Sequence, residues 1–282
     1  ICRGYFLPRM KLSENKEFIC GWGAAFINIT CTYPINKLMF RQMLHDVDSR
    51  DALKQLRSEG TFYLYRGVLA PLCQKTVSVS IMFGMYQEYQ RLAEMLHPSI
   101  NPTLNKFIAA LLSGTTEAIL TPFERVQTLM QDRAYHGKFQ NSIHTFRELR
   151  PFGIKEYYRG IIPILMRNGP SNVMFFLMRD EASKILPSNG TWYGDLVSNF
   201  VGGAVIGAII SSVFYPLNVV KTRMQCTVGG EFVTFRHMLK VILAERGNKY
   251  TKLFRGVHVN YTRALLSWGI INASYELLIT TM

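Results

Sequence analysis

A pattern that occurs three times in the same order constrains this chain more than any other feature. Each copy has a proline at the end of an apolar run and, further on, an aromatic-Arg-Gly triplet. The prolines are Pro34, Pro122 and Pro216, and the triplets end at Gly67, Gly160 and Gly256. Successive prolines lie 88 and 94 residues apart, and successive triplet glycines 93 and 96 apart. This period predicts one supersecondary unit used three times, with neighbouring units sharing a buried core.

Each copy also carries two small residues, thirteen and nine positions before its proline. They are Gly21 and Ala25, Ala109 and Ser113, and Gly203 and Gly207. Small residues at this spacing allow two helices in a membrane to approach closely. We divide the chain into an N-terminal segment, 1–16, and three repeats at 17–100, 101–190 and 191–282.

The composition favours a membrane protein over a soluble one. Hydrophobic residues make up 48% of the chain and charged residues only 18%, whereas soluble domains carry about 25% charge. Residues 18–36 and 196–220 contain no charge at all, and both runs are long enough to cross a bilayer. The net charge of +13 suits cationic loops outside the membrane. It suits a nucleic-acid-binding protein less well, because the uncharged runs are too long.

The fold class predicted from these patterns is an all-α membrane protein with six transmembrane helices in three pseudo-symmetric repeats. Each repeat is expected to hold two long helices around a short one. The proline of each first long helix should kink or break it, since proline removes a backbone donor. Amphipathic spacing predicts short surface helices over Asp51–Glu59 and Phe232–Glu245.

The sequence offers no pattern typical of an enzyme, a metal site or a bound cofactor. The five cysteines are scattered and form no CxxC pair. The glycine-rich stretch 202–207 lacks the GxGxxG spacing and lies inside a long apolar run. We therefore expect no catalysis, no metal, no resident cofactor and no nucleic acid as a partner.

One cation lies alone in the second long helix of each repeat. Lys75, Arg167 and Arg263 follow their triplet glycines by eight, seven and seven residues, or about 10–12 Å along a helix. A charge inside a membrane is costly and usually faces a wet cavity. Snorkelling or pairing explains one such cation, but three at matched depth indicate a cationic ring around an aqueous site.

The prolines, the triplets and their order resemble the mitochondrial carrier family over about residues 17–282. The resemblance implies a six-helix barrel in the inner mitochondrial membrane that opens alternately to each side. The short helices would face the matrix, and both termini the intermembrane space. The family motif on each first helix is Pro-x-[Asp/Glu]-x-x-[Lys/Arg], in which an acid of one repeat pairs with a base of the next and closes a matrix gate.

This matrix-gate motif is incomplete here. The gate positions are occupied by Asn36, Glu124, Gln127, Asn218 and Lys221, with Met39 at the sixth. Glu124–Lys221 is the expected ion pair and Asn36–Gln127 a possible neutral hydrogen bond, while Asn218 faces an apolar partner. Gln131 and Gln225, nine residues after their prolines, match the bracing glutamines of the family.

The gate on the opposite side lacks its usual cations altogether. The family pattern on the second helices, [Tyr/Phe]-[Asp/Glu]-x-x-[Lys/Arg], falls on Tyr86 with Gln90, Arg179 with Ser183, and Tyr275 with Ile279. The resemblance therefore does not explain how that side closes.

The resemblance places the substrate contacts on the cation ring and its neighbours. We predict a substrate site formed by seven residues: Gln74, Lys75, Glu117, Arg167, Asn168, Arg263 and Asn272. Arginine and lysine suit phosphate oxygens. Glu117 is the only acid between Phe107 and Phe123. It either pairs with Arg167 or Arg263, or it faces a cationic group on the substrate.

Four segments are similar to the branch of the family that carries NAD⁺, and they are 115–119, 122–127, 229–232 and 267–273. The resemblance implies import of NAD⁺ into the matrix, with a carrier of another nucleotide or coenzyme as the alternative. It also implies a bilayer partner, including cardiolipin, and function as a monomer.

Overall fold

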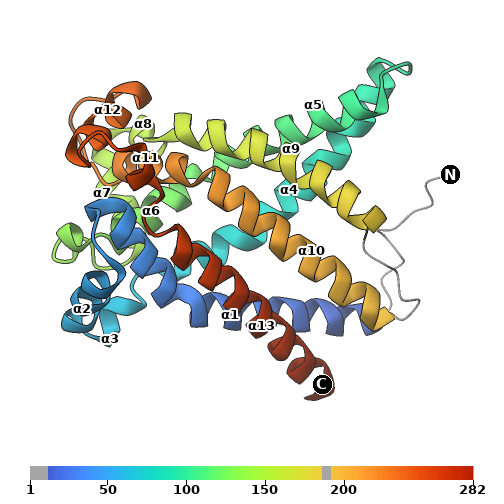
Figure 1. The fold of residues 1–282 in the computed structure, drawn as a ribbon, viewed down its shortest axis with the longest axis horizontal. Coiled ribbons are helices and arrows are strands. Elements are labelled where there is room, and N and C mark those ends of the chain that lie inside the picture. The colour runs from blue at the N-terminus through green and yellow to red at the C-terminus, as the bar shows by residue number, and fades with distance from the viewer. Residues whose placement is uncertain (1–11, 186–191, 282) are drawn as a thin grey trace.

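The computed structural model describes residues 12–185 and 192–281, so most of the predicted N-terminal segment lies outside the described residues. The described residues form helices and contain no strand. The short helices gather at one end of the molecule, which we call the short-helix end, and the long helices extend from it (Figure 1). At the opposite end the long helices lie further apart (Figure 1).

Each repeat contains the predicted long, short, long order. Repeat 1 consists of α1 (Leu12–His45), α2 (Ser49–Glu59), α3 (Thr61–Leu64) and α4 (Leu69–Leu96). Repeat 2 consists of α5 (Pro102–Glu117), η1 (Ala118–Leu120), α6 (Thr121–Gln131), η2 (Arg133–Tyr135), α7 (Ser142–Leu149), η3 (Arg150–Phe152), α8 (Ile154–Tyr157) and α9 (Ile161–Ile185). Repeat 3 consists of α10 (Trp192–Val213), α11 (Tyr215–Gln225), α12 (Phe235–Glu245), η4 (Tyr250–Phe254) and α13 (Val257–Thr281).

The repeat prolines break two of the three first helices. Pro122 and Pro216 lie in the first turns of α6 and α11, where a missing backbone N–H costs little. In repeat 1, however, α1 continues past Pro34 without a break. The predicted interruption is therefore confirmed in repeats 2 and 3, whereas repeat 1 keeps one helix.

The two predicted surface helices are present. The segment Asp51–Glu59 lies within α2, and α12 ends at Glu245 as expected. α12 begins at Phe235 and not at Phe232, because the Thr234 side chain accepts a hydrogen bond from the His237 N–H and caps the helix there.

The three triplet glycines adopt the same backbone conformation at closely packed positions. Gly67, Gly160 and Gly256 have φ angles of 87°, 82° and 92°, a region that favours glycine. A Cβ atom on Gly67 would lie 2.7 Å from the Cβ atom of Met130, which belongs to repeat 2. The short-helix end is therefore packed so tightly at this point that it leaves no room for a methyl group.

Each triplet arginine binds the loop that follows the first helix of the next repeat. Arg66 donates to the Tyr135 carbonyl at 3.1 Å, and Arg159 donates to the Gly229 carbonyl at 2.9 Å. Arg255 closes the circle, because it donates to the Asp46 carbonyl at 2.6 Å. We call these three contact regions seam 1–2, seam 2–3 and seam 3–1.

Within residues 12–185 and 192–281, no single helix combines the length and the mean hydropathy of a membrane span. One bent pair does meet the criterion: Gly202–Val213 and Tyr215–Gln225, which meet at 63°.

Candidate functional site

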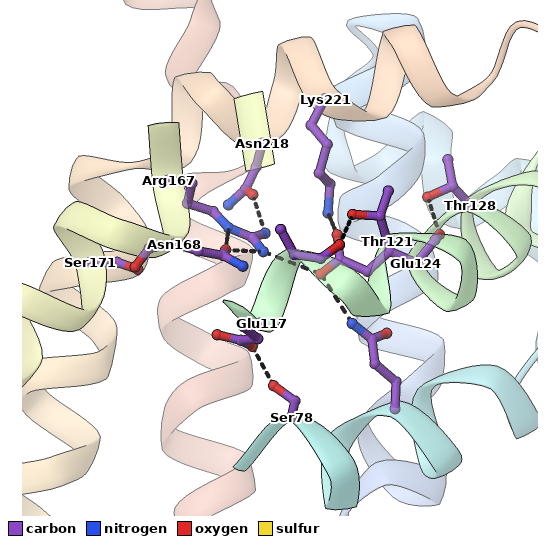
Figure 2. Close-up of polar contacts among 12 residues, drawn as sticks. Ser78, Glu117, Thr121, Glu124, Thr128, Arg167, Asn168, Ser171, Asn218 and Lys221 are labelled. Atoms are coloured by element: carbon purple, nitrogen blue, oxygen red, sulfur yellow. Dashed lines mark hydrogen bonds and ion pairs between the residues drawn. The ribbon is translucent and has the colours of Figure 1, made fainter. Parts of the chain in front are cut away.

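Glu124 is the centre of a polar cluster that joins all three repeats. Its Oε1 atom accepts hydrogen bonds from Gln74 of α4 at 3.0 Å and from Arg167 of α9 at 3.2 Å. Its Oε2 atom accepts from Lys221 of α11 at 3.0 Å. Figure 2 shows Arg167 and Lys221 reaching this carboxylate from two different helices. One acid therefore connects repeat 1, repeat 2 and repeat 3.

Arg167 extends this cluster through its other nitrogen atoms. Its Nη1 donates to the Asn218 side chain at 2.8 Å, and its Nε and Nη2 donate to Asn168 at 2.9 and 2.8 Å (Figure 2). Asn168 is buried, so the arginine is fixed in position by a rigid neighbour. Arg167 lies between the predicted substrate site and the predicted gate, and it contacts residues of both.

The expected contacts of the matrix gate are present only in part. The Glu124–Lys221 ion pair is in place. Within the described residues, the side chains of Asn36 and Gln127 make no hydrogen bond with each other, so the possible neutral pair is not formed in this structure. Asn218 binds Arg167, a contact that the family pattern does not indicate.

The two predicted bracing glutamines occupy buried positions next to other repeats. Gln225 is fully buried and accepts a hydrogen bond from Thr128 of α6 at 3.0 Å, which links repeat 3 to repeat 2. Gln131 is buried beside Tyr33 of repeat 1. Both positions suit a brace, although this role stays a prediction.

Glu117 makes neither of the two ion pairs that the sequence left open. Its carboxylate accepts a hydrogen bond from Ser78 of α4. Among the described residues it has no cationic partner, and Figure 2 shows it turned toward Ser78, apart from Arg167. Among the described side chains, Glu117 therefore presents a negative charge that no cation neutralises.

The remaining predicted substrate residues lie on two of the second long helices. Arg263 on α13 donates to Asn260 of the same helix at 3.2 Å, and its buried Nε has no partner among the described residues. Lys75 lies on α4 and Asn272 on α13; their side chains are outside the described part of the structure. Arg263 thus retains donor capacity that an anion can use.

A second charged network was not predicted from the sequence. Arg125 and Arg159 flank Glu156 at distances of 2.7 and 2.9 Å, and all three side chains are at most 4% exposed. Arg159 also donates to the carbonyls of Gly229 at 2.9 Å and Gly230 at 3.1 Å.

The loop that this network holds, 227–231, follows α11 and contains two consecutive glycines of positive φ. Gly229 and Gly230 both have φ of 70°, which lets their carbonyls converge on one guanidinium group. The Gly229 N–H donates to Glu156 at 3.2 Å, and Phe232 packs against the Arg159 guanidinium at 4.3 Å. The signal available in the sequence was the Gly-Gly-Glu-Phe motif, but a motif does not reveal its partner.

Comparison of the sequence with known protein families identifies the family of this chain. A sequence profile of the family described as mitochondrial carrier protein matches residues 11–95, 100–190 and 194–282. The chain therefore belongs to the mitochondrial carrier family. It is a multi-pass protein of the inner mitochondrial membrane and a transporter, not an enzyme, and the all-α fold of three repeats is confirmed.

Three individual relatives are similar over nearly the whole chain. The mitochondrial nicotinamide adenine dinucleotide transporter SLC25A51 of Mus musculus is 49% identical over 268 residues, which cover 95% of this chain and 90% of that protein. The proteins of Homo sapiens named mitochondrial nicotinamide adenine dinucleotide transporter SLC25A51 and SLC25A52 are each 48% identical over 268 residues, with the same coverage.

Proposed function

We propose that this carrier imports NAD⁺ into the mitochondrial matrix by alternating access through a central site. The site is formed by the cations Lys75, Arg167 and Arg263 together with Glu117. The observation that carries the proposal is the separation of the charges. Glu117 is held by a neutral serine, while Arg263 keeps an unpartnered buried nitrogen.

NAD⁺ matches this separation chemically. Its pyrophosphate carries two negative charges, which suit arginine forks and a lysine ammonium group. Its oxidised nicotinamide ring carries a positive charge, which a carboxylate attracts. The similarity to relatives named as nicotinamide adenine dinucleotide transporters supports the same substrate. Gln74, Asn168 and Asn272 would then bind the uncharged parts of the molecule.

The closed short-helix end supports import as part of this proposal. The Glu124 cluster joins the three repeats near that end, which the family resemblance places on the matrix side. In the proposed cycle, substrate then enters from the intermembrane space. Opening of the Glu124 cluster would release the substrate into the matrix. We expect the carrier to act as a monomer in a bilayer that contains cardiolipin.

A carrier of another nucleotide or coenzyme is the alternative. The cation ring alone would accept ATP or coenzyme A, because their phosphates present the same chemistry. Glu117 distinguishes the two proposals, since it adds nothing favourable for a substrate that lacks a cationic ring.

The test is uptake of radiolabelled NAD⁺ into liposomes that contain the purified chain, with ATP, NADH and NMN as competitors. We expect saturable uptake that Arg263→Ala reduces at least tenfold. A matched control is Arg91→Ala, because Arg91 forms only an exposed ion pair with Glu88. Absence of NAD⁺ uptake, together with saturable ATP uptake, would replace NAD⁺ by the alternative.

A second measurement concerns the choice between the oxidised and reduced dinucleotides. Glu117→Gln keeps a hydrogen-bond acceptor for Ser78 but removes the negative charge. We expect this variant to lose most of its preference for NAD⁺ over NADH. Equal selectivity of the variant and the parent would remove Glu117 from the proposed recognition.

A further inference from the structure

Aromatic side chains join two of the second long helices at the end opposite the short helices. Tyr86 of α4 stacks on Phe176 of α9, with ring centroids 3.7 Å apart and an angle of 7° between the planes. Phe83 meets the same Phe176 ring edge-on at 5.8 Å. The Arg179 guanidinium lies over the Phe83 ring at 5.6 Å. We call these four residues the aromatic seam.

The aromatic seam lies at the start of the two gate motifs that lack their cations. Tyr86 and Arg179 both follow their triplet glycines by nineteen residues, and they begin the two motifs that end in Gln90 and Ser183. Phe83 and Phe176 both follow their glycines by sixteen residues, and repeat 3 has Asn272 at that position. Aromatic residues therefore occupy this position in repeats 1 and 2 but not in repeat 3.

Polar contacts reinforce the aromatic seam through α5, which lies between the two helices. The hydroxyl of Tyr89 on α4 lies 2.8 Å from that of Thr116 on α5. The buried Asn105 of α5 donates to the Glu94 side chain of α4 at 3.1 Å. On the other side of α5, Lys106 pairs with Asp180 of α9. Apolar, polar and ionic contacts thus join α4, α5 and α9 at one end.

The contact between α4 and α9 is informative because the gate at the short-helix end is closed in the same structure. The short-helix end is closed here by the Glu124 cluster, and alternating access then requires the other end to be open. A fully symmetric mechanism would separate α4 from α9 at that open end. Instead, their aromatic rings are in contact, so α4 and α9 are not separated in the state in which the short-helix end is closed.

We propose that α4, α5 and α9 form one preassembled body at the intermembrane-space end and stay together throughout the transport cycle. Opening and closing on that side is then a movement of repeat 3, through α10 and α13, against this body. The aromatic seam replaces the missing cations of repeats 1 and 2 by permanent packing. The proposal rests on the alternating access of the proposed function, although not on the identity of the substrate.

The test is reversible cross-linking in a cysteine-free background that retains uptake. The variant Phe83→Cys with Phe176→Cys is treated with a short bifunctional methanethiosulfonate reagent. We expect efficient cross-linking, with the cross-linked protein keeping at least half of its uptake rate. The matched pair Phe176→Cys with Tyr275→Cys connects the body to repeat 3, since Tyr275 on α13 follows its triplet glycine by nineteen residues as Tyr86 does. Its cross-linking should lower uptake at least tenfold, and a reductant should restore it.

Two results would overturn the proposal. One is failure of the first pair to cross-link, which would deny the contact. The other is loss of uptake on cross-linking that pair, restored by reductant, since this would require α4 and α9 to separate. If the aromatic substitutions prevent folding, Lys106→Cys with Asp180→Cys tests the same body through half-exposed side chains. Uptake of NAD⁺ and ATP by the untreated parent is measured first, so that a wrong substrate is recognised separately.

Discussion

Seam 2–3 and seam 1–2 occupy equivalent places in the threefold repeat, yet different chemistry holds them together. Seam 2–3 contains the Glu124–Lys221 ion pair and the buried Glu156–Arg159 network. In seam 1–2 the triplet arginine binds one loop carbonyl, that of Tyr135. The repeat therefore preserves the shape of the short-helix end, whereas the buried Glu156 network belongs to seam 2–3. Seam 1–2 contains the more distant Arg133–Glu59 pair at 3.7 Å, and seam 3–1 contains the pairs of Arg255 with Asp46 and Asp48.

This difference in contacts predicts which seam separates first when the short-helix end opens. Removing one partner of a buried ion pair costs about 3–5 kcal/mol, whereas a hydrogen bond that involves one charged group contributes about 1.5–3 kcal/mol. Seam 1–2 should therefore separate more easily than seam 2–3. Gln74 moderates this difference, because it is the residue of repeat 1 that binds Glu124.

The largest expected effect comes from removing the carboxylate at the centre of the cluster. Glu124→Gln preserves side-chain size but removes the negative charge that Arg167 and Lys221 share. We expect uptake to fall at least tenfold and the melting temperature in detergent to fall by several degrees. Lys221→Ala should have a smaller effect, because Arg167 and Gln74 still bind Glu124. Unchanged transport in Lys221→Ala would show that its ion pair does not control the gate.

A second pair of variants compares the triplet arginines directly. Arg159→Lys loses the planar fork that binds Glu156 and several carbonyls at once. Arg66→Lys loses one hydrogen bond to Tyr135. Thermal unfolding in the same detergent should show a clearly larger decrease in melting temperature for Arg159→Lys. Equal decreases would mean that the buried network adds nothing to seam 2–3.

Adding an ion pair to seam 1–2 should reduce the difference in stability between seam 1–2 and seam 2–3. Asn36→Asp combined with Gln127→Lys installs the family pattern where the described residues show no contact. We expect a higher melting temperature and slower uptake, because the matrix-closed state gains an ion pair. Asn36→Asp alone is the control, and it should not be stabilising. If the double variant is no more stable than this control, the two positions do not approach each other when the gate closes.

The smallest expected effect is a pH dependence at seam 1–2. His136 follows η2 and stacks on Tyr63 with ring centroids 4.5 Å apart. Burial, together with the cations Lys37, Arg66, Arg41 and Arg133, lowers the pKa of His136 from 6.5 to about 4. Between these two values the unfolded chain binds more protons than the folded one, so stability should decrease as the pH falls from about 6.5 to about 4.

His136→Phe tests this dependence, since it retains an aromatic ring for Tyr63 but cannot titrate. The melting temperature of the variant should fall less than that of the parent between pH 7 and pH 5. Parallel curves for the two proteins would assign the pH dependence to other groups.

The sequence predicted how far along each helix the charged residues lie, but it did not predict which residues of other helices they contact. Spacing from the triplet glycines predicted that Arg167 lies at the same depth as Lys75 and Arg263, which stays a prediction. The proline motif predicted the Glu124–Lys221 pair, which is present. Spacing along one helix could not show that Arg167 and Gln74 turn toward Glu124, because that depends on how neighbouring helices rotate and pack. The network around Glu156 was missed for a related reason, since its contacts join segments about 70 residues apart.

For the fold as well, local sequence signals predicted some features of the helices and not others. Proline chemistry predicted the breaks at Pro122 and Pro216, where the helix begins anew. In repeat 1, α1 continues past Pro34, and the same local signal does not predict this difference.

At the short-helix end, the space beside two of the triplet glycines, Gly67 and Gly256, is too small for an added methyl group. A methyl group on Gly256 would lie 2.5 Å from the Tyr215 hydroxyl and 2.9 Å from the Gln42 side-chain oxygen. Since one residue comes from repeat 3 and the other from repeat 1, such a methyl group would act as a wedge between the two repeats. We therefore expect a single added carbon atom at this position to bias the carrier toward a form that is open at the short-helix end.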